Sequence, residues 1–374
     1  MAATAMEHRT FGRTGWNVTS VGVGTWAIGG AWGEPDDEVS VAALHAALDD
    51  GINVIDTANI YSDAGTVGRS ERLIGRVLKE RKDAGKSGRV FVLTKAGRQG
   101  THSPANYTYE ALKAEAQGSL ERLGVDALDL LQLHCPPREV LDAGTAFAAL
   151  QRIRDEDKLI REWGVSVETE EEALLCIAQP GCAAVQIIIN AFRAKPLGKV
   201  LAAAREAGTA LLARVPLASG LLTGKVDAAF VASLPPSDHR VFNRLGESFD
   251  AGETWSGLGA HLDTAIEAVD GVREAYAAYI ARINASSASA ATDGSADPST
   301  DSPADPTLAQ FALRWILDAA GSDSPVVVIP GVRSVAQSRA NAAAGRAPPL
   351  SADEVAAVRA VYDAKIGPLI HSKW

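Results

Sequence analysis

Residues 90–96 read VFVLTKA and residues 128–134 read LDLLQLH, and stretches of this kind decide the fold. Each is a short, continuous apolar run without strict alternation, which is typical of a strand buried on both faces of a parallel sheet. Six more such runs occur along the chain: VGVGTWAI (21–28), NVIDTA (53–58), WGVSV (163–167), AVQIII (184–189), ALLARVP (210–216) and VVVIPG (326–331). The sequence therefore predicts eight parallel strands.

Amphipathic segments separate these runs. In residues 109–123, Leu112, Ala116 and Leu120 share one helical face, and Gly124 follows as a helix stop. Eight strands with helices between them fit either a closed (β/α)8 barrel or an open doubly wound sheet, and the count of eight favours the barrel. We therefore expect a single α/β barrel domain over residues 1–374. The opening HRTFGRTGWNVTSV (8–21) predicts an N-terminal hairpin that plugs the barrel bottom.

The gap between the seventh and eighth runs is much longer than the others. Within it, residues 283–306 read INASSASAATDGSADPSTDSPADP, which is rich in Ala, Ser, Asp and Pro and poor in large apolar residues. Such a segment cannot bury enough apolar surface to offset the entropy lost on ordering. We predict a flexible surface loop at 283–306, within a long insertion after strand seven.

Composition narrows the class of partner. The net charge of −10 argues against nucleic acid and against an anionic membrane surface. Cys135, Cys176 and Cys182 form neither an even disulfide set nor a metal-ligand spacing. No signal-peptide core or membrane-spanning run is present in the sequence. We expect a cytoplasmic protein without a metal, a monomer or weak homo-oligomer, that acts on a small molecule.

Polar residues stand at the ends of three neighbouring runs. Asp56 lies near the end of the second, Lys95 near the end of the third and His134 closes the fourth. The chemistry of a barrel sits at the carboxyl ends of its strands. Adjacent strands bring Asp56 and Lys95 within reach, and a charge in an apolar strand is costly unless it is paired. A purely structural ion pair explains these two residues equally well, and a core histidine explains His134 by itself.

Tyr61, in the loop just after the second run, changes that balance. A tyrosine is a poor acid at neutral pH, with an ordinary pKa near 10. The ammonium of Lys95 would favour the phenolate and lower the pKa of Tyr61, while Asp56 would keep Lys95 charged. His134 would then hydrogen-bond a substrate carbonyl. Together these residues predict a proton donor for the reduction of C=O groups.

At this point the sequence resembles the aldo-keto reductase superfamily over nearly its whole length. GINVIDTANIYSDAGTVGRSERLIGRVL (51–78) is similar to the family segment with the tetrad Asp and Tyr, FVLTKAG (91–97) to that with the Lys, and LDLLQLHCP (128–136) to that with the His. The resemblance implies the same barrel and hydride transfer from NAD(P)H to an aldehyde or ketone. It implies a catalytic tetrad of Asp56, Tyr61, Lys95 and His134, with Trp26, Tyr61 and His134 contacting substrate.

The loops after strands seven and eight resemble the family's cofactor site. Residues 214–225 (RVPLASGLLTGK) are similar to its pyrophosphate belt and residues 329–334 (IPGVRS) to its adenosine-phosphate clamp. The resemblance implies NADPH contacts by Gly24, Thr25, Asp56, Ser166, Gln186, Arg214, Leu217, Ser219, Gly220, Leu222, Gly224, Lys225, Ile329, Gly331, Arg333, Ser334, Gln337 and Asn341. Arg333 and Ser334 at a helix start suit a 2′-phosphate, although Arg333 also fits a solvated surface cation.

Three positions depart from the family pattern. Val167 follows Ser166 where an Asn is frequent, Ile189 replaces a frequent Tyr, and Arg214 replaces the aromatic that stacks on the nicotinamide. A guanidinium plane also stacks, so these changes bear on cofactor affinity more than on the chemistry.

Two other functions remain open from the sequence. A lysine near a barrel strand end also serves Schiff-base lyases, which would give Lys95 a different role. Some relatives of the family are non-catalytic NADPH-binding regulatory subunits.

Overall fold

Eight parallel strands curl into the barrel that the sequence predicts. The computed structural model describes residues 5–30, 36–62, 67–86, 88–236, 238–243, 262–292 and 305–373. The strands are β3 (Val23–Gly24), β4 (Val54–Asp56), β5 (Phe91–Ala96), β6 (Leu128–His134), β7 (Ile160–Ser166), β8 (Cys182–Ile188), β9 (Ala210–Arg214) and β10 (Val326–Val328), hydrogen-bonded in chain order. Gly22 N donates to Val328 O (2.8 Å) and Gly24 N to Pro330 O (2.9 Å), which joins the two ends of the sheet. The barrel is therefore closed.

An antiparallel hairpin precedes the barrel, as expected. Its strands are β1 (His8–Thr10) and β2 (Asn17–Thr19). Phe11 and Val18 of the hairpin pack in one cluster with Val54, Leu130 and other side chains of the barrel interior. The hairpin therefore seals the amino-terminal end of the strands and leaves only the carboxyl end open.

The period of two along the strands places the polar residues inside the barrel. On β5, Phe91 and Leu93 belong to the interior cluster, so Lys95 points the same way. Val54 and Asp56 are related in the same manner on β4. A polar layer therefore lies on top of an apolar one, at the open end of the barrel.

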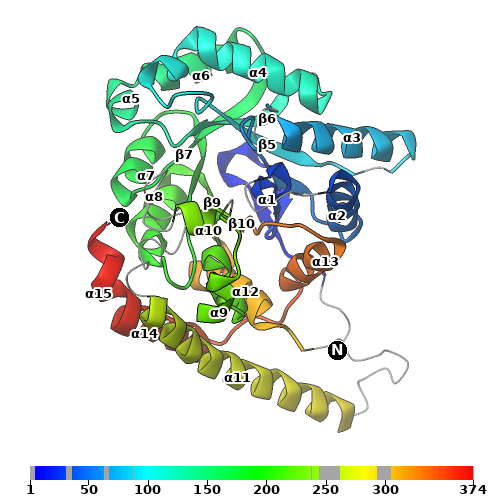
Figure 1. Cartoon of the computed structure of the whole chain (residues 1–374), viewed down its shortest axis with the longest axis vertical. Coiled ribbons are helices and arrows are strands. Elements are labelled where there is room, and N and C mark those ends of the chain that lie inside the picture. The colour runs from blue at the N-terminus through cyan, green and yellow to red at the C-terminus, as the bar shows by residue number, and fades with distance from the viewer. Residues whose placement is uncertain are drawn as a thin grey trace.

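Helices surround the barrel on all sides (Figure 1). They are α1 (Trp26–Gly29), α2 (Asp37–Asp49), α3 (Arg69–Asp83), α4 (Tyr109–Leu123), α5 (Arg138–Ala143), α6 (Thr145–Asp155), α7 (Glu170–Ile177), α8 (Lys199–Ala207), α9 (Ala228–Ala232), α10 (His239–Phe242), α11 (Leu262–Thr292), α12 (Leu308–Ala320), α13 (Val335–Ala344), α14 (Ala352–Val361) and α15 (Gly367–Ile370). Within the described ranges, no helix combines the length and apolarity needed to cross a membrane.

The prediction of a loop over 283–306 is wrong for its first ten residues. Helix α11 continues to Thr292, and Ile283 is buried on it. Ser286 and Ser287 each donate a side-chain hydrogen bond to the carbonyl four residues earlier, as serines within helices do. Alanine has the highest helix propensity, so a helix already under way continues through this composition. Residues 293–304 lie outside the described residues, and 305–306 are not helical.

Candidate active site

A cavity of about 1020 Å³ opens at the carboxyl ends of the strands. Asp56, Tyr61 and His134 line it together with residues that follow β9 and β10. The connection from β9 to α11 contributes Phe230 of α9 and Arg240 of α10, so this segment forms one wall of the cavity. Figure 1 places α9 and α10 over the β9 and β10 side of the barrel.

Lys95 and Asp56 form a buried ion pair, which confirms the expected pairing. Lys95 Nζ donates to Asp56 Oδ1 at 2.6 Å, and the side chains are 0% and 4% exposed. The second carboxylate oxygen, Oδ2, accepts from Gln186 Nε2 at 2.8 Å. Burial lowers the pKa of Lys95, but the charge of Asp56 and the contact with Tyr61 outweigh it, so the net pKa of Lys95 is raised. The lysine is therefore held as an ammonium.

Tyr61 completes a chain with that pair. Lys95 Nζ lies 3.1 Å from the Tyr61 hydroxyl and 4.8 Å from the centre of its ring. Burial raises the pKa of Tyr61 above its ordinary value, and the charge of Lys95 opposes this without reversing it. Lys95 lowers the pKa of Tyr61 as expected, but the net pKa is raised and not lowered, because burial of the phenol outweighs the ammonium. Tyr61 keeps its proton at neutral pH.

His134 faces Tyr61 across the cavity floor. The two rings meet edge to face, with centroids 5.9 Å apart. Burial, followed by the charges of Lys95 and Arg98, holds the pKa of His134 well below its usual range. Neither ring nitrogen hydrogen-bonds to a residue in the described ranges, whereas the backbone carbonyl accepts from the Tyr107 hydroxyl at 2.9 Å. A neutral imidazole therefore presents a polar edge to the cavity.

The loop after β9 is strained where the sequence predicts a pyrophosphate belt. Val215, Ala218 and Ser219 have positive φ angles of 49°, 50° and 52°, and Gly220 follows at 99°. Non-glycine residues adopt this region at a cost of order 1–3 kcal/mol each, and such residues cluster at functional sites. Of these four, Val215, Ser219 and Gly220 line the cavity.

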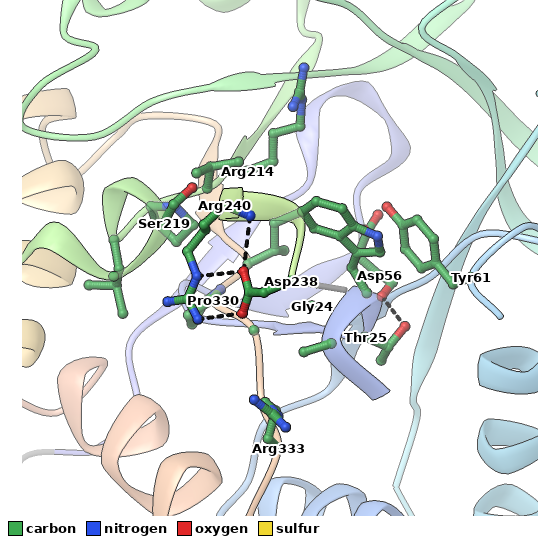
Figure 2. Close-up of a pocket in the computed structure, with 18 of the residues that line it drawn as sticks. Gly24, Thr25, Asp56, Tyr61, Arg214, Ser219, Asp238, Arg240, Pro330 and Arg333 are labelled. Atoms are coloured by element: carbon green, nitrogen blue, oxygen red, sulfur yellow. Dashed lines mark hydrogen bonds and ion pairs between the residues drawn. The ribbon is translucent and has the colours of Figure 1, made fainter. Parts of the chain in front are cut away.

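The loop after β10 is held by its own side chains. Asn341 Nδ2 donates to Gly331 O at 3.2 Å, and Arg333 N donates to Gln337 Oε1 at 2.7 Å. Ser334 caps α13 by accepting from Gln337 N. The guanidinium of Arg333 is exposed, lines the cavity and has no ion pair with any described residue. Figure 2 shows Arg333 standing apart from the other labelled side chains.

Most of the residues predicted to hold a cofactor meet at this cavity. Those that line it are Gly24, Thr25, Asp56, Gln186, Arg214, Leu217, Ser219, Gly220, Lys225, Ile329, Gly331, Arg333 and Gln337. Ser166, Leu222, Gly224, Ser334 and Asn341 do not line it. Trp26, predicted to contact substrate, does. The cofactor and substrate roles of all these residues stay predictions.

Several residues of this cavity escaped the sequence analysis. Asp238 and Arg240 form a two-pronged ion pair, with Arg240 Nε and Nη2 at 2.8 and 2.7 Å from the carboxylate, shown in Figure 2 beside Pro330. Arg98 and His102, in the loop after β5, also line the cavity. Arg98 and His102 lie in a loop, and Asp238 and Arg240 lie at the start of α10, which is too short to show a periodic pattern. The only available signal was the position of Arg98, three residues beyond Lys95.

Comparison with known proteins identifies relatives with this architecture. The chain is 34% identical over 224 residues to the aldo-keto reductase YhdN of Bacillus subtilis, covering 59% of this chain and 65% of that one. It is 28% identical over 281 residues to the NADH-specific methylglyoxal reductase of Escherichia coli, covering 70% and 83%. The chain thus spans slightly under two thirds of the length of YhdN.

Solved structures share the fold over nearly the full length. A glycerol dehydrogenase from Gluconobacter oxydans superposes with a TM-score of 0.67 and 26% identity, covering 98% of this chain and 97% of that one. An aldo/keto reductase from Klebsiella pneumoniae in complex with NADP and acetate has a TM-score of 0.62 and 22% identity, with 96% of each chain covered. The model of the Aldo/keto reductase family matches residues 20–363. With that match over most of its length, the chain belongs to the aldo/keto reductase family.

Proposed function

We propose that this protein reduces an aldehyde or ketone to an alcohol, with NADPH as the hydride donor and Tyr61 as the general acid. The observation that carries the proposal is the position of Lys95 Nζ, within hydrogen-bond distance of both Asp56 and Tyr61 at the floor of the cavity. If the Asp56–Lys95 pair only stabilised the fold, it would not require the Tyr61 hydroxyl beside it at the cavity surface. The chain Asp56–Lys95–Tyr61 instead ends on a hydroxyl that a ligand can reach.

Tyr61, His134 and Lys95, at the floor of the cavity, have different roles in proton transfer. A substrate carbonyl oxygen placed between the Tyr61 hydroxyl and the His134 ring receives a hydrogen bond from each, because both groups are neutral at pH 7. When bound, the nicotinamide supplies the hydride that reaches the carbonyl carbon. Tyr61 then passes its proton to the oxygen, and the ammonium of Lys95 stabilises the phenolate that is left.

Asp56 and Gln186 hold this arrangement in place. Asp56 keeps Lys95 charged, and Gln186 satisfies the other carboxylate oxygen. Without that donor, Asp56 would have a buried oxygen with only a long contact to Gln132 at 3.4 Å. The raised pKa of Tyr61 keeps the phenol protonated over the whole physiological pH range, so the donor carries its proton throughout that range.

The cavity also suits a dinucleotide phosphate. Arg214, Lys225, Arg240 and Arg333 line its β9 and β10 side, in a protein whose net charge is −10. Gly220 and Gly331 have no Cβ atom there, so the backbone can approach a phosphate closely. Arg214 would stack on the nicotinamide in place of an aromatic ring. The exposed Arg333 supports NADPH over NADH.

The Schiff-base alternative fits the site less well. Such chemistry needs a deprotonated amine, whereas the ion pair with Asp56 raises the pKa of Lys95. All three donor directions of the ammonium are in use, on Asp56, on Thr57 O at 2.8 Å and on Tyr61. A purely regulatory subunit would not need this complete set of groups.

Replacing Tyr61 with phenylalanine tests the proposal. Tyr61→Phe keeps the ring and removes the proton donor, so kcat for carbonyl reduction should fall by about 10²–10⁴-fold while NADPH binding changes little. Activity is measured as NADPH oxidation with a panel of aldehydes and ketones, and cofactor affinity by fluorescence titration. Tyr276→Phe is the matched control, since its hydroxyl bonds Pro306 O outside the cavity. Retention of most activity by Tyr61→Phe would refute the proposal.

A further inference from the structure

Five cationic side chains and two carboxylates line the cavity, and one of the cations lies apart from the proposed cofactor loops. The cations are Arg98, Arg214, Lys225, Arg240 and Arg333, and the carboxylates are Asp56 and Asp238. Asp56 is paired with Lys95 and Asp238 with Arg240. Four of the five cations follow β9 or β10, where the cofactor phosphates are expected. Arg98 follows β5.

The barrel topology places Arg98 on the other side of the cavity mouth. Passing from β5 to β10 crosses β4 and β3, and passing from β5 to β9 crosses three strands in the other direction. Arg98 therefore stands beside the strand ends that carry Tyr61, Lys95 and His134, not beside the strained loop after β9. Its charge is one of those that lower the pKa of His134, after burial and the charge of Lys95.

Arg98 has no charged partner among the described residues. It is half-buried and makes no hydrogen bond or ion pair with any residue in the described ranges. Other arginines of this molecule at similar burial, such as Arg154 on α6, have carboxylate partners. A partly buried guanidinium that faces a cavity without a carboxylate is arranged to meet an anion that arrives from solvent.

The loop that carries Arg98 is fixed in place. Gly97 N donates to Glu115 Oε2 of α4 at 2.8 Å, and the same oxygen accepts from Asn59 Nδ2 at 2.5 Å. Asn59 lies two residues before Tyr61, so one carboxylate ties the loop of the proton donor to the loop of Arg98. His102 follows on the same loop, with Nε2 3.1 Å from the Tyr107 hydroxyl. The distance between the reacting centre and Arg98 is therefore set by the fold.

We propose that Arg98 is an anion subsite on the substrate side of this cavity, and that the carbonyl substrate carries a carboxylate or phosphate group. The inference rests on the proposed function, because it assigns the carbonyl end of the same substrate to Tyr61 and His134. Trp26 and Ile60 add apolar side chains to the lining of the same cavity. The preceding reaction, which supplies this substrate, must then yield one small molecule that carries both an acidic group and a carbonyl group.

The test compares matched substrates in the full chain at saturating NADPH. Succinic semialdehyde and butanal differ by a carboxylate, and glyceraldehyde 3-phosphate and glyceraldehyde differ by a phosphate. The wild type should prefer the anionic member of at least one pair in kcat/KM, and the pair that shows this identifies the acidic group. Arg98→Gln should reduce that preference by about ten- to a hundredfold, as expected for the loss of a hydrogen bond to a charged group. Arg98→Lys should recover part of the preference and Arg98→Glu should reverse it.

Arg138→Gln, an exposed arginine of α5 paired with Asp142, controls for the loss of one positive charge. An unchanged preference in Arg98→Gln would overturn the proposal, as would an equal loss for the charged and the neutral substrates, which would mean that Arg98 acts only through His134. If no carbonyl compound is reduced at all, the proposed function fails. Calorimetry of succinate binding to the NADPH-loaded protein then decides the subsite alone, and equal binding by wild type and Arg98→Gln would overturn it.

Discussion

The floor and the rim of the cavity are built on different principles. On the floor, Asp56, Lys95 and Gln186 are 3%, 0% and 1% exposed, and they hydrogen-bond one another. On the rim, Arg333 and Lys225 are exposed and Arg98 is half-buried. The floor stands on strand ends inside a packed barrel, whereas the rim stands on the connections between elements. The buried strand ends, which tolerate few substitutions, therefore hold the groups that carry out the reaction. The connections, which tolerate more substitutions, hold the groups that select the cofactor and the substrate.

Loss of the floor cation should have the largest effect. Lys95→Met leaves Asp56 buried beside Gln186 without a counter-charge and removes the ammonium that stabilises the Tyr61 phenolate. Breaking a buried pair in this way costs about 3–5 kcal/mol of unfolding free energy. Activity should fall by at least the 10²–10⁴-fold of general acid catalysis. Denaturant unfolding and NADPH oxidation measure the two losses.

Lys79→Met is the matched control on the outside of the molecule. Lys79 pairs with Asp83 one turn along α3, and its side chain is 77% exposed. Such an exposed pair, screened by solvent, contributes little to the unfolding free energy. If Lys95→Met and Lys79→Met lost equally little unfolding free energy and activity, the buried ion pair would be no more important than an exposed one.

The rim should respond with a change of selectivity instead of a loss of chemistry. Arg333→Ala removes a cation with no partner among the described residues, so it should weaken NADPH binding by about ten- to a hundredfold and NADH binding much less. Arg339 is the fifth residue of α13. Arg339→Ala should show whether this second cation also contributes to binding of the 2′-phosphate. Dissociation constants of both cofactors are compared in wild type and variants. Equal losses for NADPH and NADH would show that Arg333 does not read the 2′-phosphate.

Glu115, which joins the two regions, should give a smaller effect that depends on pH. Burial raises the pKa of this carboxyl, against the hydrogen bonds from Gly97 and Asn59. Its favourable contribution is therefore complete below the unfolded pKa of about 4.3 and is lost as pH rises through the folded pKa. The unfolding free energy of wild type relative to Glu115→Gln should fall over that window, because the glutamine does not titrate.

The measurement is a series of denaturant unfolding curves between pH 4 and 8. Glu121→Gln, an exposed site on the same helix, is the control for losing one carboxylate from α4. An unfolding free energy of the wild type, relative to Glu115→Gln, that rises with pH would contradict the direction of the shift. Activity measured in parallel reports whether the tie between the Asn59 and Gly97 loops also holds the cavity in shape.

The same contrast explains what could be predicted from the sequence. The buried runs and their polar ends located Asp56, Lys95 and His134, because the strand period and the barrel rule leave these positions little freedom. Arg98 was missed because loop residues follow no period, and Arg240 because the four-residue helix α10 is too short to show one. The net pKa direction of Tyr61 was wrong because the degree of burial is a tertiary property. Residues 283–292 were assigned to a loop on composition, yet alanine and serine continue a helix that packing has already started.

The smallest effect is expected from replacing residues 289–304, within the insertion after strand seven. Asn284 Nδ2 contacts Asp305 Oδ2 at 3.3 Å, so the chain on either side of residues 289–304 can be joined by a short link. Replacing 289–304 by a four-residue Gly-Ser linker should change the unfolding free energy by no more than about 1 kcal/mol, since loop length enters only logarithmically. Carbonyl reduction should be unaffected. Ile283→Ala, just before the deletion, should cost about 2–5 kcal/mol because that side chain is buried. Thermal and denaturant unfolding of both variants show where α11 stops contributing to stability. If the replacement of 289–304 lowered the unfolding free energy as much as Ile283→Ala does, residues beyond 288 would also stabilise the fold.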